Sequence, residues 1–139
     1  MTTGRLGIIF QLFNTFTCHT ELMIIVYGIP NCDTVKKTRA WLTARALPYC
    51  FHDFKKSGVP ACLLPTWIRM FGAFRLVNRQ GTTWRKLDAC TQNSAIDDTG
   101  AMALMMAQPS VIKRPVVDWG NGNITVGFDA SAWTDHLPV

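Results

Sequence analysis

The stretch MIIVYGIPNCDTVKK at residues 23–37 decides the fold. Residues 23–28 form a β-branched run that ends in a glycine, which is typical of a buried strand. A four-residue loop containing a proline follows, and Asp33 and Thr34 can then accept hydrogen bonds from the free N–H groups of a first helical turn. The stretch therefore predicts a strand, a tight loop and a helix that opens at about Asp33.

The next residues complete a β–α–β unit. Side chains that suit a buried helix face recur at helical spacing, at Val35, Thr38, Trp41 and Leu42. Pro48 stops this helix, and residues 49–54 predict a second strand. Two strands joined by a helix within about 30 residues are expected to be parallel, with a right-handed crossover.

The remaining chain adds a helical middle and a hairpin. Residues 60–108 contain no good strand, and their patterns predict helical segments at 63–71, 84–87 and 101–107. A turn signal at 120–122 (GNG) joins strands expected at 116–118 and 123–126. Asp129 then caps a last helix that carries Trp133 and Leu137. The fold class expected is α/β, a mixed four-stranded sheet with a helical insertion.

Composition limits the classes of function. The 139 residues suit one domain, and the net charge of +5 favours anionic partners. The basic residues form short groups and not one long stripe, so nucleic acid is not expected as a partner. No apolar run reaches the ~18 residues that span a bilayer. Residues 1–22 lack a clear secretory signal and are expected to be a poorly ordered extension of a domain at 23–139.

Five cysteines at irregular spacing, without a CxxC pair or a zinc-type array, indicate a reducing cytoplasm and not a disulfide scaffold. Cys32 differs from the rest because it lies between a strand and a helix, where backbone N–H groups and the helix dipole stabilise a thiolate. Lys36 and Lys37 add positive charge, and Thr34 can donate its hydroxyl to the sulfur. Cys32 is therefore the expected nucleophile.

The other thiols and the histidines carry less information. We expect buried or incidental roles for the other four cysteines, which are Cys18, Cys50, Cys62 and Cys90. The alternative for Cys62 or Cys90 is a role as the thiol that resolves an intermediate on Cys32. Cys90 falls in a loop-like stretch. The three histidines form no recognisable dyad with Cys32 in the sequence, and structural or surface roles are expected for His19, His52 and His136.

Val35 stands where a CxxC motif would place its second cysteine. A dithiol cycle within the motif is therefore impossible, and an external thiol or a distant cysteine must clear any intermediate on Cys32. Glutathione is the obvious external thiol in a reducing cell. No bound cofactor is expected.

Three blocks of the sequence together resemble the ArsC family of glutaredoxin-coupled arsenate reductases, and most of all its YffB-like branch of glutathione-dependent thiol reductases. The blocks are residues 23–37, residues 79–87 (RQGTTWRKL) and residues 112–117 (IKRPVV), and the resemblance covers about residues 23–135. It implies a thioredoxin-like fold with a helical insertion. The order and the spacing of the blocks make the resemblance specific.

The resemblance also implies roles for particular residues. Cys32 is then the attacking thiolate, and Arg114 binds an oxyanion or stabilises the thiolate. The Arg114–Pro115 peptide bond is then cis and faces the cysteine. Without the resemblance, a trans proline would be the default. Arg79 falls near the family's second anion-binding arginine, with a one-residue ambiguity against Asn78. The loop residues expected to contact substrate are Asn31, Asp33, Thr34 and Pro115. Further anionic contacts, to substrate or to glutathione carboxylates, are expected from Arg79, Arg85 and Lys86, for which a solvated surface role is equally compatible.

The chain departs from true arsenate reductases at three positions. Gly28 stands where they carry a histidine, Val35 where they carry a serine, and Gly127 near their third arginine. Thiol chemistry is therefore favoured over arsenate chemistry.

Three functional hypotheses follow. The first is a monothiol, glutathione-dependent thiol reductase that acts on anionic or disulfide substrates, with glutathione or glutaredoxin as its partner. The second is a redox-sensing adaptor or an Spx-like regulator on the same fold, although Spx-like proteins usually carry a CxxC pair. The third is an inert paralogue.

Overall fold

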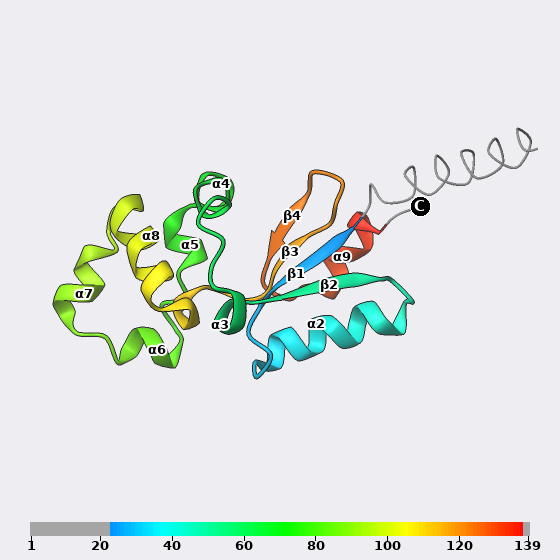
Figure 1. The fold of residues 1–139 in the computed structure, drawn as a ribbon, viewed down its shortest axis with the longest axis horizontal. Helices are drawn as coiled ribbons and strands as arrows, with labels where there is room; N and C mark the ends of the chain where they lie inside the picture. Colours follow the sequence, from blue (N-terminus) through cyan, green and yellow to red (C-terminus); the bar gives the residue numbers. More distant parts are fainter. Residues whose placement is uncertain (1–22, 138–139) are drawn as a thin grey trace, which may run out of the picture.

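The computed structural model describes residues 23–137, so the expected extension at residues 1–22 lies outside the described residues. The described chain is built on one sheet with strand order β2-β1-β3-β4 (Figure 1). The strands are β1 (Ile24–Gly28), β2 (Tyr49–Asp53), β3 (Val116–Asp118) and β4 (Ile124–Val126). β1 pairs in parallel with β2 and antiparallel with β3, and β3 pairs antiparallel with β4. The expected mixed four-stranded sheet is confirmed.

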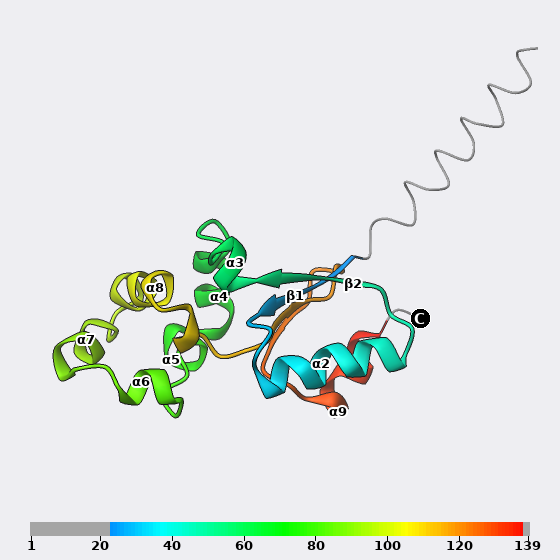
Figure 2. The ribbon, with the colours of Figure 1, turned by 60° about the horizontal axis from the view of Figure 1, so that its bottom comes forward.

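Helices α2 (Asp33–Ala44) and α9 (Ala130–Trp133) cover one face of this sheet (Figure 2). They bury a cluster that includes Trp41, Trp119 and Trp133, whose ring centroids are 5.3–6.3 Å apart. Asp129 accepts a hydrogen bond from the N–H of Ala132 at 3.1 Å, as expected for a cap. A 3₁₀ turn (Thr134–His136) follows α9.

The helical insertion between β2 and β3 lies at one end of the sheet and packs on its other face (Figures 1 and 2). Its helices are α3 (Phe54–Ser57), α4 (Leu64–Phe71), α5 (Ala73–Leu76), α6 (Thr82–Arg85), α7 (Ala89–Ser94) and α8 (Asp98–Ala107), and a 3₁₀ turn (Pro109–Val111) ends it. An isolated bridge between Val77 and Ile112 joins the middle of the insertion to its exit. The insertion and the sheet share one core, in which Trp67 of α4 packs against Tyr27 of β1.

Several boundaries differ from the sequence prediction because acidic side chains cap helices early. Phe54 was expected in the second strand, but the Asp53 carboxylate accepts hydrogen bonds from the N–H groups of Lys55 and Lys56 and starts α3. The helix expected at 101–107 begins at Asp98, because Asp97 accepts a hydrogen bond from the N–H of Gly100.

The prediction that Cys90 lies in a loop is wrong. Asp88 caps α7 through the N–H of Thr91, and Cys90 is exposed on this helix. The six residues of α7 are too few and too polar to show a helical period, so the sequence pattern does not predict this helix.

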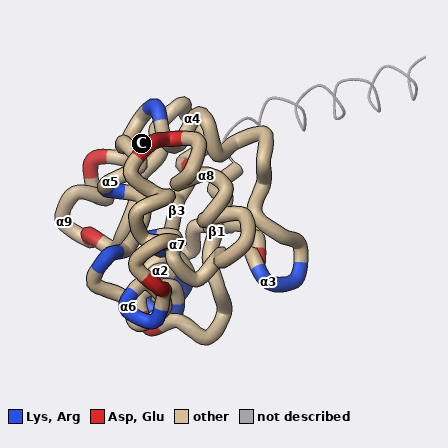
Figure 3. Tube along the Cα trace, turned by 90° about the vertical axis from the view of Figure 1, so that its left-hand side faces the viewer, with Lys and Arg blue, Asp and Glu red and all other residues tan. Residues whose placement is uncertain are grey.

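No helix within residues 23–137 is long and apolar enough to cross a membrane. Lys and Arg fall in separate short groups along the trace, such as those at α3 and α6 (Figure 3). No group of three or more His, Cys, Asp or Glu side chains within the described part of the chain could hold a metal ion.

Candidate active site

Cys32 occupies the position that the sequence predicts, between β1 and α2. It is the N-cap residue of α2, with extended backbone angles of φ −138° and ψ 127°, and its side chain is half-buried. Its carbonyl accepts the first hydrogen bond of the helix, from the N–H of Lys36 at 2.9 Å. The sulfur does not close the helix end with a capping hydrogen bond of regular geometry, so nearby N–H groups act on it as oriented dipoles.

Thr34 links the sulfur to the opposite side of the site. Its hydroxyl oxygen Oγ1 lies 3.1 Å from Sγ of Cys32, and either atom can be the donor. The same Oγ1 lies 3.2 Å from the carbonyl oxygen of Arg114, to which it can donate. The start of α2 therefore contacts a residue 80 positions away in the sequence.

Arg114 precedes Pro115 across a cis peptide bond, which confirms the expectation taken from the resemblance. Its Nη1 donates to the carbonyl of Ser110 at 2.7 Å. Its Nε is buried and has no hydrogen-bond partner within residues 23–137. Arg114 is half-buried, and it thus retains an unused donor, which is rare for a buried polar atom.

These groups decide the charge of Cys32. Burial by itself would raise the pKa of the thiol, because it penalises the thiolate. The hydroxyl of Thr34, the N–H of Val35 and the guanidinium of Arg114 favour the thiolate and outweigh burial, so the pKa of Cys32 is lowered from its ordinary value. The geometry is that of an activated, partly accessible thiol.

Gly28 and Val35 fill the places where arsenate reductases carry their histidine and serine, and they pack against each other. A Cβ built on Gly28 would lie 2.7 Å from Cγ2 of Val35, which is closer than real contacts allow. Val35 is completely buried. This apolar contact leaves no polar side-chain atom at either position to act on the sulfur.

The remaining loop residues flank the sulfur. Asn31 and Asp33 are exposed on either side of Cys32, and Pro115 is buried under the site. The structure therefore brings together Cys32, Thr34 and Arg114 by contact. The expectation that Asn31 and Asp33 bind substrate remains a prediction.

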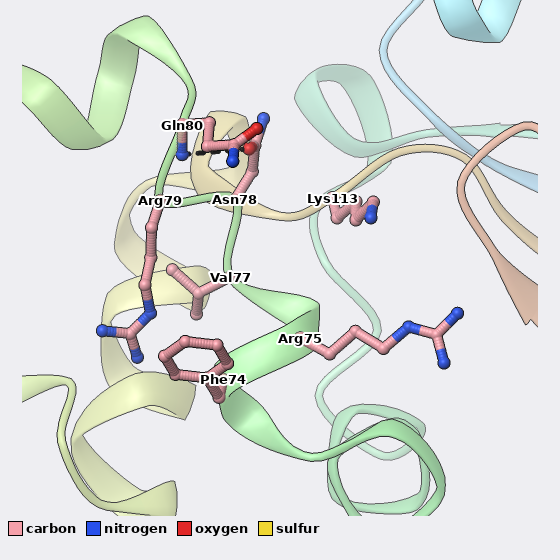
Figure 4. Close-up of a pocket in the computed structure, with 7 residues that line it drawn as sticks. All are labelled: Phe74, Arg75, Val77, Asn78, Arg79, Gln80 and Lys113. Carbon is pink, nitrogen blue, oxygen red and sulfur yellow. Dashed lines mark hydrogen bonds between the residues drawn. The ribbon is translucent and has the colours of Figure 1, made fainter.

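Arg79 lies in a separate pocket of about 460 Å³ (Figure 4). Its guanidinium sits 4.5 Å from the ring centroid of Phe74 and 5.0 Å from that of Trp84. These rings hold the cation by cation–π contacts. Arg85 and Lys86 are exposed at the end of α6. The anion-binding roles expected for these three residues remain predictions.

Sequence analysis missed two further cations of this pocket. Arg75 comes from α5, and Lys113 comes from the segment that pairs with Val77 through the Val77–Ile112 bridge (Figure 4). No acidic residue within 23–137 lines the pocket. The signal for Lys113 was its place directly before Arg114, whereas Arg75 carried no signal because only the tertiary fold brings it to the pocket.

The other described cysteines are exposed, so incidental roles fit them and burial does not: Cys50, Cys62 and Cys90. Cys18 lies outside the described residues. His52 contacts the carbonyl of Gly58 at 2.7 Å and packs on Tyr27, in keeping with a structural role. His136 stacks on the ring of Trp119.

Comparison with known proteins places this site in a family. The model of the ArsC family matches residues 27–136. The solved structure of a YffB protein is 42% identical and covers 83% of this chain and 99% of its own, with a TM-score of 0.78. An arsenate reductase (ArsC) related protein of Brucella melitensis is 40% identical, with 82% and 93% covered and a TM-score of 0.65.

A more distant relative carries a regulatory name. The global transcriptional regulator Spx of Staphylococcus aureus is 20% identical over 118 residues, which are 84% of this chain and 88% of its own. The structural matches confirm the thioredoxin-like fold with its helical insertion. The chain therefore belongs to the ArsC family, in its YffB-like branch.

Proposed function

We propose that this chain is a monothiol reductase of disulfides, with Cys32 as the nucleophile and glutathione or a glutaredoxin as the thiol donor. One observation carries the proposal: Thr34, Val35 and Arg114 lower the pKa of a thiol that stays partly exposed. A partly accessible thiolate is the reactive form of cysteine in thiol–disulfide exchange.

The reaction balances without a bound cofactor. The Cys32 thiolate attacks the glutathione sulfur of a glutathionylated substrate, forming a Cys32–glutathione disulfide and releasing the substrate as a thiolate, which takes a proton from solvent. A second glutathione thiolate then attacks this mixed disulfide. Oxidised glutathione leaves, and the Cys32 thiolate is regenerated. The substrate sulfur is reduced to a thiol and the sulfur of the second glutathione is oxidised, while the first glutathione sulfur stays at the disulfide level.

The second step requires an external thiol because Val35 fills the CxxC position and is completely buried. We assign to Arg114 the stabilisation of sulfur anions in both steps. Its Nε has no hydrogen-bond partner among the described residues, and a charge-assisted hydrogen bond to such a donor contributes about 1.5–3 kcal/mol.

We propose the pocket with Arg79 and Lys113 as the place for the carboxylates of glutathione, because the charged residues that line it in the described chain are all cations, and one of them, Lys113, directly precedes Arg114. Arg79→Ala is expected to raise the KM for glutathione about three- to tenfold with little change in kcat, the pattern of a lost binding contact. Arg85→Ala and Lys86→Ala test whether these exposed residues contribute. An unchanged KM in Arg79→Ala would remove the pocket from the proposal.

The deciding assay measures turnover of a mixed disulfide of glutathione and a small thiol, with excess glutathione. Cys32→Ser is expected to abolish turnover, whereas Cys90→Ser, which removes an exposed thiol on α7, is expected to keep it. Full activity of Cys32→Ser would refute the assignment of the nucleophile.

The redox-sensing regulator is the second candidate, and the similarity to Spx favours it. A sensor would form one stoichiometric adduct on Cys32 and release it slowly. Mass spectrometry after exposure to oxidised glutathione, together with the turnover assay, separates the two: an adduct without turnover supports the sensor.

A further inference from the structure

Oγ1 of Thr34 is within hydrogen-bond distance of two other polar atoms of the site, Sγ of Cys32 and the carbonyl oxygen of Arg114. Oγ1 is 3.1 Å from the sulfur and 3.2 Å from the carbonyl oxygen. Thr34 is exposed, and Cys32 and Arg114 are half-buried. The two neighbours of the hydroxyl come from opposite sides of the site, the start of α2 and the residue before Pro115.

The hydroxyl has one proton to donate, but it has two possible acceptors. A carbonyl only accepts, so a neutral Cys32 completes a chain in which S–H donates to Oγ1 and the hydroxyl donates to Arg114. A thiolate also only accepts. When Cys32 loses its proton to solvent, the hydroxyl must turn toward the sulfur, and the carbonyl loses its donor.

We propose that Thr34 couples Cys32 to the Arg114 carbonyl, so that a substrate N–H that replaces the hydroxyl as the donor to this carbonyl frees the hydroxyl proton for the sulfur and favours the thiolate. This inference rests on the proposed function and names its substrate class, a peptidyl disulfide. The amide N–H groups of a peptide lie a few bonds from its disulfide sulfur, within reach of a carbonyl beside Cys32. An oxyanion presents mainly acceptor oxygens, which the carbonyl repels.

Binding linkage makes the coupling reciprocal. A peptide that donates to Arg114 should promote ionisation of Cys32, and ionisation of Cys32 should strengthen the binding of that peptide. The thiolate would then be most abundant when a reducible peptide is in place.

The first test compares Thr34→Val, which removes the hydroxyl and keeps the shape, with Thr34→Ser, which keeps the hydroxyl. The rate of alkylation of Cys32 by iodoacetamide is followed against pH, with the modified peptide resolved by mass spectrometry because other cysteines are exposed. At pH values below the midpoint of this alkylation profile, Cys32 in Thr34→Val should react about three- to tenfold more slowly than in the wild type, as expected for one lost hydrogen bond. The alkylation rate of Thr34→Ser should stay close to that of the wild type. Thr43→Val, at an exposed threonine of the same helix, is the matched control. An identical pH profile for wild type and Thr34→Val overturns the inference.

The second test adds S-methylglutathione, a peptide that cannot exchange, and inorganic sulfate as an oxyanion probe. S-methylglutathione should move the alkylation midpoint of the wild type and of Thr34→Ser to lower pH and leave that of Thr34→Val in place. Sulfate should not cause a shift of the alkylation midpoint that requires the hydroxyl of Thr34. A wild-type midpoint that the peptide does not move, or an equal shift in Thr34→Val, overturns the coupling.

A direct readout comes from carbon-detected NMR of the Arg114 carbonyl and the Pro115 nitrogen. The carbonyl resonance should titrate with Cys32 in the wild type, and the change should be lost in Thr34→Val. None of these measurements needs turnover. If turnover is absent while the midpoints and the carbonyl behave as described, the proposed function fails and the coupling stands; if turnover is present but Thr34→Val matches wild type, only the coupling fails.

Discussion

Gly28→Ala should destabilise the protein, although alanine is normally the better residue in a strand. Gly28 lies at the end of β1 and its φ is not in the left-handed region, so a Cβ is allowed by the backbone. Replacing glycine at such a position normally stabilises a protein by about 0.4–1 kcal/mol through the unfolded state. The new Cβ would, however, lie 2.7 Å from Cγ2 of Val35.

The size of the effect follows from how little Val35 can move. Val35 is fully buried, and a β-branched side chain in a helix has one strongly preferred rotamer. Overpacking of a closed core costs about 1–3 kcal/mol. After the gain from the unfolded state, the net loss should be about 1–2 kcal/mol. With Val35→Ala already present the clash is gone, and Gly28→Ala should be neutral or stabilising.

Urea unfolding followed by tryptophan fluorescence measures the free energies of unfolding of the wild type, the two single variants and the double variant. The double-mutant cycle should give a coupling energy of about 1–3 kcal/mol between the two sites. Equal effects of Gly28→Ala in both backgrounds, or stabilisation in the wild-type background, would refute the packing argument. Success would also mean that a histidine at position 28 requires a smaller residue at position 35.

Other perturbations give equally definite expectations. Arg114→Ala should raise the pKa of Cys32, seen as slower alkylation near pH 7, and should weaken oxyanion binding in calorimetry; no change in either quantity would remove Arg114 from the site. Because the pKa of Cys32 is lowered on folding, its thiolate stabilises the protein above the ordinary thiol pKa of about 8.5, and this contribution is lost as pH falls through the lowered value. Wild type should therefore gain stability over Cys32→Ser as the pH rises from below the lowered pKa toward the ordinary thiol pKa of about 8.5, and parallel stability curves would contradict the shift. Gly100→Ala should lower Tm strongly, because its Cβ would clash with the backbone oxygen of Ser94, whereas Thr99→Ala at the exposed neighbouring residue should not; equal Tm values would contradict the packing of α8.

The local signals of the sequence were strong where one segment determines its own structure. The β-branched run before Gly28 and the turn at 120–122 predicted β1 and the hairpin closely. Cys32 was found for the same reason, since its place between a strand and a helix is set by its neighbours along the chain.

Features that depend on distant segments could not be predicted in this way. The contact between Gly28 and Val35 appears only when β1 and α2 are packed together. The direction of Arg79 is set by the rings of Phe74 and Trp84, whose positions depend on the folded insertion. The cis bond before Pro115 came from resemblance alone, because a proline at that place in the sequence is compatible with either isomer.

The three indoles between α2, β3 and α9 have an optical consequence. Trp41, Trp119 and Trp133 lie edge to face at 5.3–6.3 Å, close enough for their electronic transitions to couple. Such coupling gives a characteristic near-ultraviolet circular dichroism signal that vanishes when the rings separate. Because Trp41 belongs to the helix that begins next to Cys32, this signal reports, without any label, whether the helix carrying the thiol is docked on the sheet.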